Sequence, residues 1–344
     1  MPRVSIILPT KNSMRFLGER VESIKAQAFS DFEVIALDTA STDGTREYLA
    51  KWAAEDPRVK VRDVPPGVYR ALNAGIAMAS GAFVYFAMSD DTMRPDALEK
   101  MVAALDRNPD CGICDSRLVE IDDGGNVLED GDALHLECFR HLFFDRTKGC
   151  IRRPPFDFYL HCCGRTVYTS LTQILVRKRV FDVCGGFPED RGSSADFYWG
   201  MKCAMTQSVV YLPDELATWR LHGEQLTGHD FSYRNFTLMC EMIDDVLAQP
   251  MDEEIRAVAR KLSGIVHFKA TLLPVKRGGT ALQKAAGLAK GVLLYPRFSA
   301  WFFVLAIRAR FFRRESRPEI AAYCELFYRL LRKHALESLL HEHA

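Results

Sequence analysis

Short apolar runs alternate with amphipathic segments through the first ~120 residues of the chain. The runs are rich in Val, Ile and Phe, as buried strands are. The segments between them carry apolar residues at the three-to-four spacing of helices. This alternation predicts an α/β fold with a doubly wound sheet and helices on both faces. The expected strands are 4–8, 32–37, 59–61, 83–88 and 112–121, and the expected helices are 15–28, 45–53, 69–79 and 95–107.

Strand signals return at 171–176 and 209–212 and then stop near residue 230. Beyond that point, every periodic segment predicts a helix. The 344 residues suffice for one large α/β domain and an appendage. We therefore expect a catalytic domain at 1–230 and a helical C-terminal region at 231–344.

The composition is that of a globular protein without a general affinity for nucleic acid. Hydrophobic residues make up 48% of the chain, and 45 basic residues balance 45 acidic ones. The amino terminus enters a strand directly and lacks the apolar core of a secretory signal. No stretch is apolar enough to span a bilayer, and the ten cysteines are scattered, as in reduced proteins. We therefore expect a cytoplasmic protein.

Carboxylates follow two of the expected strands. Asp38 and Asp43 come after the second strand, and Asp90 and Asp91 come after the fourth. Open α/β sheets bind ligands at the carboxyl ends of their strands, and adjacent carboxylates can hold a hard divalent cation. Such a cation suits a diphosphate group, so the pattern indicates an enzyme that uses a nucleotide diphosphate. For Asp43 a turn-forming role is the favoured interpretation.

Six motifs occur in an order that is typical of one enzyme family. They are VSIILPTKN, DTASTDGT, GVYRALNAGIAMASGAFVYFAMSDD, GGFPED, SADFYW and RLHGEQLT. In this order, over residues 2–228, the chain resembles glycosyltransferase family 2. The resemblance implies the GT-A fold, a doubly wound mixed sheet with a Rossmann-like nucleotide-binding half. It also implies transfer of a sugar from a nucleotide-diphosphate donor to an acceptor hydroxyl, with inversion at the anomeric carbon.

The resemblance assigns the nucleotide-sugar site to the early motifs. Pro9 and Thr10 end the first strand, where the backbone can pass under a nucleotide base. Asp38 matches the carboxylate that accepts from the uracil ring nitrogen, which favours a UDP-sugar. Asn73 matches the family at its position in GVYRALNAGI. Arg70 stands where several relatives carry Asp, and contact with the diphosphate and an exposed helix position are both open for it.

The family's metal motif, of the DXD type, matches Asp90 and Asp91. The resemblance implies that Asp91 ligates Mg²⁺ or Mn²⁺ between the two phosphates, while Asp90 contacts the ribose or the water shell of the metal. Met88 stands where many relatives carry another Asp or Asn, which weakens the ribose assignment more than the metal assignment. His222 in the RLH segment is expected to reach the metal or the diphosphate, with a structural role equally open. For the acidic pair, the alternative is stabilisation of the following helix through its dipole.

The catalytic base of the family matches Asp196 in SADFYWGMK, at the start of an expected helix. In an inverting enzyme this carboxylate removes the proton of the acceptor hydroxyl, and an N-cap role is compatible with that. The segment GGFPED resembles the loop that forms the acceptor floor, with Gly185, Gly186 and Phe187, where glycine lets the backbone approach a sugar. Trp199 is expected to stack on a sugar face, with burial in the core as the alternative.

The C-terminal region carries a basic block. Between Lys261 and Arg314 there are eleven Lys or Arg and no Asp or Glu. The apolar segment 301–307 lies in this block, next to several arginines. Aromatic residues beside arginines favour contact of 261–314 with an anionic membrane surface over a helix packed on the catalytic domain. We therefore expect a peripheral protein at the inner face of the membrane, with a lipid-linked glycan of surface polysaccharide biosynthesis as its acceptor.

Two alternatives remain open. A polyprenyl-phosphate sugar synthase would use an acceptor that is already an anionic phosphate and needs no strong base. A non-catalytic nucleotide-sugar-binding scaffold would be expected to lose its carboxylates. Because Asp38, Asp90, Asp91 and Asp196 are all present, the sequence favours the enzyme over the scaffold.

Overall fold

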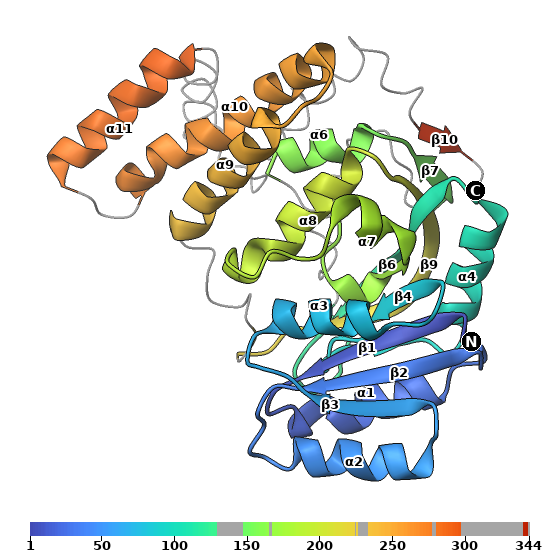
Figure 1. Cartoon of the computed structure of the whole chain (residues 1–344). Helices are drawn as coiled ribbons and strands as arrows, with labels where there is room; N and C mark the ends of the chain where they lie inside the picture. The colour runs from blue at the N-terminus through green and yellow to red at the C-terminus, as the bar shows by residue number, and fades with distance from the viewer. Residues whose placement is uncertain are drawn as a thin grey trace.

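The computed structural model describes residues 1–128, 147–164, 167–223, 225, 233–276, 280–296 and 340–342. The apolar segment 301–307 of the sequence analysis lies outside these residues. The strands within them form one ten-stranded sheet (Figure 1). Their bounds are β1 Val4–Thr10, β2 Phe32–Asp38, β3 Val59–Asp63, β4 Phe83–Phe86, β5 Thr92–Met93, β6 Cys111–Ile121, β7 Cys150–Arg152, β8 Ile174–Arg177, β9 Ser208–Arg220 and β10 Leu340–Glu342.

The strand order is β10-β7-β9-β6-β8-β4-β1-β2-β3, and β5 pairs with β9. Strands β4, β1, β2 and β3 are parallel neighbours, which confirms the predicted parallel half. Strand β8 is antiparallel to both of its neighbours, β4 and β6, and β6 is parallel to β9. The sheet is therefore mixed, as the resemblance implied.

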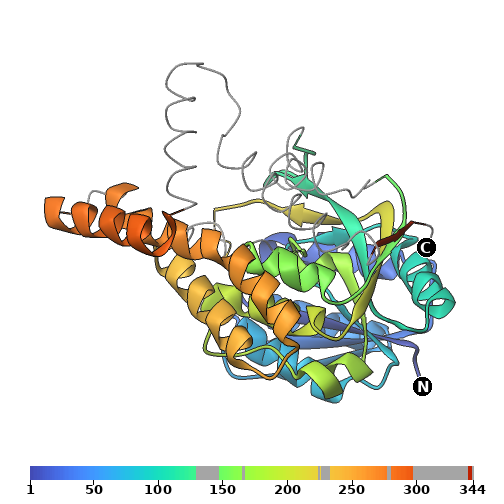
Figure 2. The same ribbon diagram turned by 90° about the horizontal axis from the view of Figure 1, so that it is seen from above.

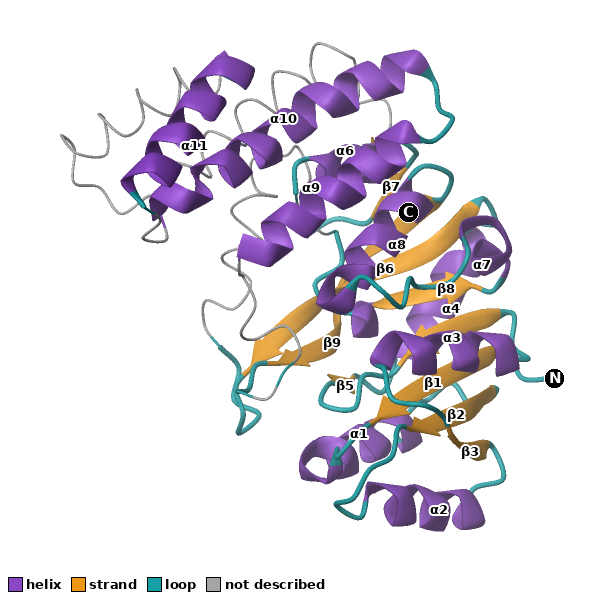
Figure 3. Cartoon of the chain, turned by 60° about the vertical axis from the view of Figure 1, so that its left-hand side comes forward, coloured by secondary structure: helices purple, strands orange, loops and turns teal. Residues whose placement is uncertain are grey.

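Helices cover both faces of the sheet. Helices α1, α2 and α4 pack on one face, and α3, α6, α7 and α8 pack on the other. Helices α9 and α10 extend this second layer, and α11 packs on α10 (Figures 1 and 3). The bounds are α1 Met14–Lys25, α2 Thr45–Glu55, α3 Val68–Met78, α4 Ala97–Arg107, α6 Phe156–Cys162, α7 Arg179–Cys184, α8 Ala195–Ala204, α9 Tyr233–Ala248, α10 Glu253–Lys276 and α11 Ala281–Leu294, with short 3₁₀ turns at Leu171–Gln173 and Gly192–Ser194.

Burial explains why the central strands are continuous apolar runs. Every residue of β1 and β2 is buried, because helices cover both faces of the parallel half. Helix α3 lies unusually close to these strands. A Cβ added at Gly75 would lie 2.4 Å from Cγ2 of Ile7, so only glycine allows this approach. The close packing fixes α3 with its first turn at the edge where β1, β2 and β3 end.

Three expectations need correction. The predicted strand 171–176 starts as a 3₁₀ turn, because the Ser170 side chain accepts from the backbone N–H of Thr172 and forms a capping box with Gln173. The predicted strand 209–212 is the much longer β9. The helix expected from 95 begins at Ala97, with Asp96 at its N-cap.

The C-terminal region is not purely helical. Helices α9, α10 and α11 follow in the predicted way, but β10 returns to the sheet and pairs antiparallel with β7. A pattern of three residues is too short for a periodicity argument to detect. The division of the chain at residue 230 stays a prediction.

Candidate functional site

The carboxyl ends of β1 and β2 lie side by side, and their polar side chains are joined. Thr10 pairs with Asp38 in the strand register, and Thr10 Oγ1 donates to Asp38 Oδ1 over 3.1 Å. Ser41 adds two bonds to this carboxylate, from its hydroxyl to Oδ1 over 2.6 Å and from its N–H to Oδ2 over 3.0 Å. Pro9, Thr10 and Asp38 are therefore buried at one edge of the sheet, as expected. Their contact with a nucleotide stays a prediction.

Asp43 fixes the loop that follows β2. Its carboxylate accepts from the N–H of Met14, over 3.0 Å, and from the N–H of Thr45, over 3.1 Å. Met14 and Thr45 are the first residues of α1 and α2, and Gly44, at φ 95°, occupies the N-cap position of α2. Asp43 thus ties together two helix N-termini, in line with the turn-forming interpretation.

Asp91 is enclosed by protein. Its side chain is 1% exposed. Oδ2 accepts from the hydroxyls of Ser170 and Thr172, each over 2.9 Å, and Oδ1 accepts from the N–H of Arg220 over 3.0 Å. Burial, with the neighbouring charge of Asp90, raises the pKa of Asp91 to about 7. The carboxylate therefore joins the loop after β4 to the 3₁₀ turn before β8 and to β9.

Asp90 is the more accessible member of the pair. Its side chain is 26% exposed, and Oδ2 lies 3.0 Å from Nε2 of His222. The ring of His222 also packs against Phe16 of α1, with 4.9 Å between the ring centroids. Asp90 and His222 come from positions 132 residues apart in the sequence. The structure thus brings together the predicted histidine and a carboxylate, but that carboxylate is Asp90.

Arg220 holds this part of the site in place, and the sequence analysis did not single it out. Its side chain is 1% exposed. The guanidinium donates to the carbonyl of Asp90 over 3.0 Å, to the carbonyls of Asp122 and Asp123, and to the carboxylate of Glu19. Arg220 is the first residue of the RLH segment, and this position was the only signal for it in the sequence.

The chemistry of a metal site fits Asp90 and His222 in part. Among the described residues, no group of three or more His, Cys, Asp or Glu side chains is placed to hold a metal ion. Carboxylate oxygen and neutral imidazole nitrogen are both ligands for Mn²⁺ or Mg²⁺. A cation bound here would therefore have two protein ligands and take the others from phosphate oxygens and water. That is the common arrangement for a cation bound together with a nucleotide.

Asp196 lies in the first turn of α8, next to helix α3. It is half-buried, and its Oδ1 accepts from the N–H of Phe197 over 2.7 Å. Burial raises the pKa of Asp196 to about 6, against the opposing effect of hydrogen bonds from Phe197 and Tyr69. The Tyr69 phenol, in the first turn of α3, also donates to the carbonyl of Ser193 over 3.3 Å. Burial, and then the charge of Asp196, raises the pKa of this phenol.

The loop after α7 is held from two sides. The Asn73 amide donates to the carbonyl of Phe187 over 2.8 Å and accepts from its N–H over 2.9 Å. Trp199 Nε1 donates to the carbonyl of Gly185 over 3.1 Å. Gly185 has φ 73°, which favours glycine, and a Cβ at Gly186 would lie 2.4 Å from Asn73 Oδ1. Asn73 therefore has a loop as its partner here, and its predicted contact with a nucleotide stays a prediction.

Trp199 differs most from its expected role. Its side chain has no exposed surface. The indole stacks on Phe181, with centroids 5.6 Å apart, and packs against Phe187 at 4.8 Å. An indole ring that is packed against Phe181 and Phe187 and has no exposed surface cannot stack on a sugar, so Trp199 is a core residue in this structure. Phe187 is buried beside it, whereas Gly185 and Gly186 are exposed.

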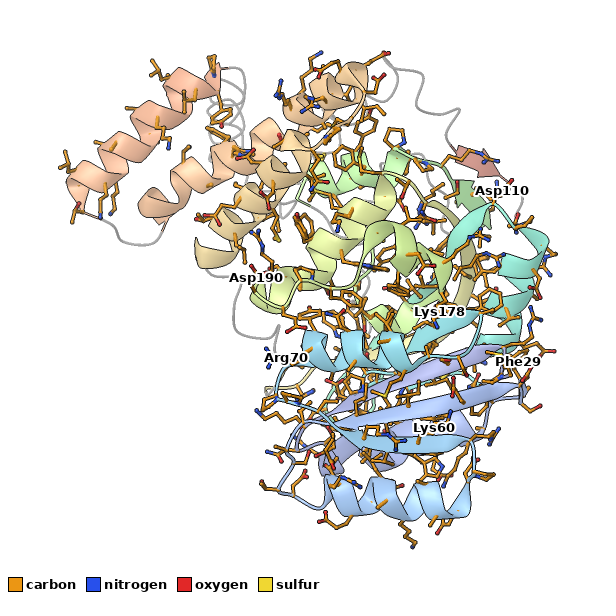
Figure 4. All side chains as sticks on the ribbon, viewed as in Figure 1. Phe29, Lys60, Arg70, Asp110, Lys178 and Asp190 are labelled. Carbon is orange, nitrogen blue, oxygen red and sulfur yellow. The ribbon has the colours of Figure 1, made fainter. Side chains whose placement is uncertain are left out.

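Arg70 is exposed and paired. Its Nε lies 2.9 Å from Oε2 of Glu189, in the loop after Phe187. Figure 4 shows Arg70 and Asp190 on the same side of the molecule, near the first turns of α3 and α8. The guanidinium is thus already paired with the carboxylate of Glu189. Both interpretations of Arg70 remain open.

Part of the chain is similar to a known enzyme family. Residues 5–167 match the family model described as Glycosyl transferase family 2. This stretch of the chain is therefore similar to glycosyltransferase family 2. A chondroitin synthase of Pasteurella multocida is 35% identical over 100 residues, which cover 29% of this chain and 10% of that protein. The matched segments span only 14%, 35% and 41% of the lengths of three other curated relatives.

Solved glycosyltransferase structures share the fold. The crystal structure of S. aureus TarS 1–349 in complex with UDP-GlcNAc has a TM-score of 0.62 at 19% identity, covering 97% of this chain and 92% of that one. The mannosyltransferase PcManGT from Pyrobaculum calidifontis, in complex with GDP-Man and Mn²⁺, has a TM-score of 0.59 at 19% identity, covering 96% and 87%. The chain has the GT-A fold with a C-terminal region that is largely helical among its described residues, and the predicted fold class is confirmed.

Within the part of the chain that the structure describes, none of the helices combines the length and the apolar character needed to cross a bilayer.

Proposed function

We propose that this glycosyltransferase is inverting and moves a sugar from a nucleotide-diphosphate donor, most favourably a UDP-sugar, to an acceptor hydroxyl. The single observation that carries the proposal is the state of Asp196. It is a half-buried carboxylate whose pKa is raised to about 6, at the start of a helix and beside the Tyr69 phenol. A base with a pKa near the working pH is the group that an inverting transfer needs.

The proposed chemistry uses one proton transfer and one displacement. The Asp196 carboxylate takes the proton of the acceptor hydroxyl as its oxygen forms a bond to the anomeric carbon. The bond between that carbon and the diphosphate oxygen breaks on the opposite face, and the electron pair leaves with the nucleotide diphosphate. Tyr69 and the N–H of Phe197 hold the carboxylate in the first turn of α8, which orients it before the acceptor binds.

For the donor, Asp38 at the end of β2 supports a uracil base, as the family resemblance implied. Solved structures with this fold are complexes with UDP-GlcNAc, UDP and GDP-Man. Ser41 and Thr10 hold the Asp38 carboxylate in one orientation. That orientation would leave an acceptor lone pair for an imide N–H.

For the cation, we assign Asp90 and His222 in place of Asp91. Asp91 is 1% exposed, and both of its oxygens already accept hydrogen bonds from the protein. Asp90 is more exposed and lies 3.0 Å from His222. When bound, Mg²⁺ or Mn²⁺ at this position would offset negative charge on the departing diphosphate. In this proposal Asp91 orients the loop that presents Asp90.

For the acceptor, we propose a lipid-linked glycan of surface polysaccharide biosynthesis. The chondroitin synthase relative supports glycan synthesis, and the basic block 261–314 supports a location at an anionic membrane surface. The proposed division of labour places transfer in residues 1–230 and surface contact in 231–344. A polyprenyl-phosphate acceptor would not need the base that Asp196 provides.

The test is thermal denaturation of the full chain with a panel of nucleotide sugars, each with and without Mn²⁺. Saturation at about 100 times the dissociation constant stabilises a protein by about 2.7 kcal/mol. We expect one donor to raise Tm, with a larger rise in Mn²⁺. Asp90→Asn should lose the Mn²⁺-dependent part and keep the rest. If no donor changes Tm in folded protein, the proposed function is wrong, and so is the alternative of a nucleotide-sugar-binding scaffold.

A further inference from the structure

Helix α11 packs on helix α10 through two glycines. Gly287 and Gly291 are its buried residues, four positions apart on one face. A Cβ at Gly291 would lie 3.0 Å from Thr271 Oγ1 and 3.2 Å from the Phe268 ring, so the backbone of α11 contacts side chains of α10 directly. Figures 1 and 2 show α11 at the margin of the molecule, beyond α10 and away from the sheet. The rest of α11 is free of such packing within the described residues.

The outward face of α11 is apolar. Leu282 and Leu293 are 80% and 81% exposed, and they lie eleven positions apart, which places them on one face of a helix. The residues between them on this face are also exposed and apolar, namely Ala285, Ala286, Ala289 and Val292. Isolated exposed leucines are ordinary. A helix whose whole outward face is apolar indicates a surface that binds something.

The charges beside this face have one sign. Lys290 lies on one flank of the apolar face, about 80° from Leu282 on the helical wheel, whereas Lys284, at about 200°, lies on the side of the two glycines. The sequence from Lys261 to Arg314 contains no acidic residue. A face of leucine and alanine with a lysine on its flank, in a stretch without acidic residues, is complementary to lipid chains below a layer of anionic headgroups. Fourteen residues extend about 21 Å, too short to cross a bilayer of about 30 Å.

We propose that the outward face of α11, centred on Leu282 and Leu293, docks on the surface of an anionic lipid bilayer, with the helix parallel to the membrane. The proposal rests on the proposed membrane contact of residues 261–314 and deepens it, because it assigns the apolar contact with the membrane to helix α11. The glycine face keeps α11 rigidly on α10 while the leucine face enters the interface. The catalytic domain is thereby held at a fixed orientation to the lipid surface.

The test is flotation of the full-length protein with vesicles of phosphatidylglycerol and phosphatidylcholine, and with vesicles of phosphatidylcholine alone. Neither donor nor acceptor is present, so the result is independent of glycosyl transfer, and Tm shifts with donor on the same preparation report on the active site separately. We expect binding to the anionic vesicles that weakens as salt is added. Absence of binding at low salt would overturn the proposal, even with donor binding intact.

Paired variants locate the contact. Leu282→Ser with Leu293→Ser should reduce binding at least about tenfold, and Lys290→Gln should reduce it about fivefold. As a control, Val183→Ser removes an apolar side chain that is 64% exposed on α7 and should leave binding unchanged. Wild-type binding by the leucine variant would overturn the proposal.

Two other occupants of the face predict different results. If a second copy of the chain covers it, sedimentation velocity will show a dimer that the leucine variant converts to monomer. If another segment of the same chain covers it, the leucine variant will have a lower Tm and unchanged vesicle binding. Either result would overturn the lipid assignment, because lipid docking predicts a monomer with an unchanged Tm and reduced vesicle binding.

Discussion

Replacing Gly186 by alanine is expected to break the connection between α3 and the loop after α7. The added Cβ would lie 2.4 Å from Oδ1 of Asn73 and 3.1 Å from its Cγ, so the Asn73 side chain must move. That movement removes the bond from Asn73 Nδ2 to the carbonyl of Phe187, at 2.8 Å, and the bond from the N–H of Phe187 to Oδ1, at 2.9 Å. The substitution thus acts on a hydrogen-bonded pair as well as on a glycine.

The magnitude follows from the two bonds. Each contributes about 0.5–1.5 kcal/mol net, so Gly186→Ala should lower the free energy of unfolding by about 1–3 kcal/mol. Asn73→Ala removes the same bonds without a clash and should lower it by a similar amount. In the double variant the alanine at 186 no longer meets the Asn73 side chain. The second substitution should therefore cost almost nothing once the first is made.

Urea denaturation of the three variants and the wild type, followed by far-UV circular dichroism, measures this double-mutant cycle. The account predicts a coupling energy of about 1–3 kcal/mol between Gly186 and Asn73. Additive effects, with a coupling below about 0.5 kcal/mol, would refute the reasoning.

Three other predictions concern the carboxylates. Activity should rise with pH through about 6, because Asp196 must be ionised to act as a base. Tyr69→Phe should shift this rise in kcat/KM to higher pH, since the phenol stabilises the charged form of Asp196. A pH profile that does not shift in Tyr69→Phe would contradict the contact between Tyr69 and Asp196. Asp90→Asn should raise the Mn²⁺ concentration for half-maximal activity at least about tenfold, with Tm unchanged. Asp91→Asn should lower the free energy of unfolding by about 1–3 kcal/mol, because an amide cannot accept all of the hydrogen bonds that the Asp91 carboxylate accepts. The reverse pattern would assign the metal to Asp91. Glu33 is buried, which opposes ionisation, yet bonds from Lys60, Ser80 and Ser5 lower its pKa from 4.5 to about 2, so the charged form stabilises the fold by at most about 3 kcal/mol above pH 4.5. Urea midpoints of the wild type and Glu33→Gln should converge as pH falls from about 4.5 towards 2, and a gap independent of pH would contradict this.

The central strands could be predicted because of how they are buried. Helices cover both faces of β1 and β2, so these strands are continuous apolar runs that stand out in the sequence. Their carboxyl ends meet at one edge for the same reason, and Thr10 and Asp38 were therefore expected together. The 3₁₀ turn before β8 was not foreseen, because a capping box made by Ser170 and Gln173 competes locally with the strand pattern.

The roles of neighbouring residues could not be predicted in the same way. Asp90 and Asp91 are chemically identical, and which of them faces solvent depends on Ser170, Thr172 and Arg220, all distant in the sequence. Such tertiary contacts leave no local signal.

The aromatic residues of the acceptor loop raise the same problem. Trp199 is hidden by Phe181 and Phe187, which come from α7 and the loop after it. An aromatic side chain next to a predicted active site is compatible with both sugar stacking and core packing until its neighbours are placed.

The most direct test of the account is Asp196→Asn, measured for donor binding and turnover on the same preparation. Asparagine keeps the shape of the side chain and cannot take the acceptor proton. We predict that the donor raises Tm as in the wild type, while transfer to a hydroxyl acceptor falls by about 10²–10⁴-fold. Turnover within about tenfold of the wild type would contradict the assignment of Asp196 as the base and favour an acceptor that is already anionic.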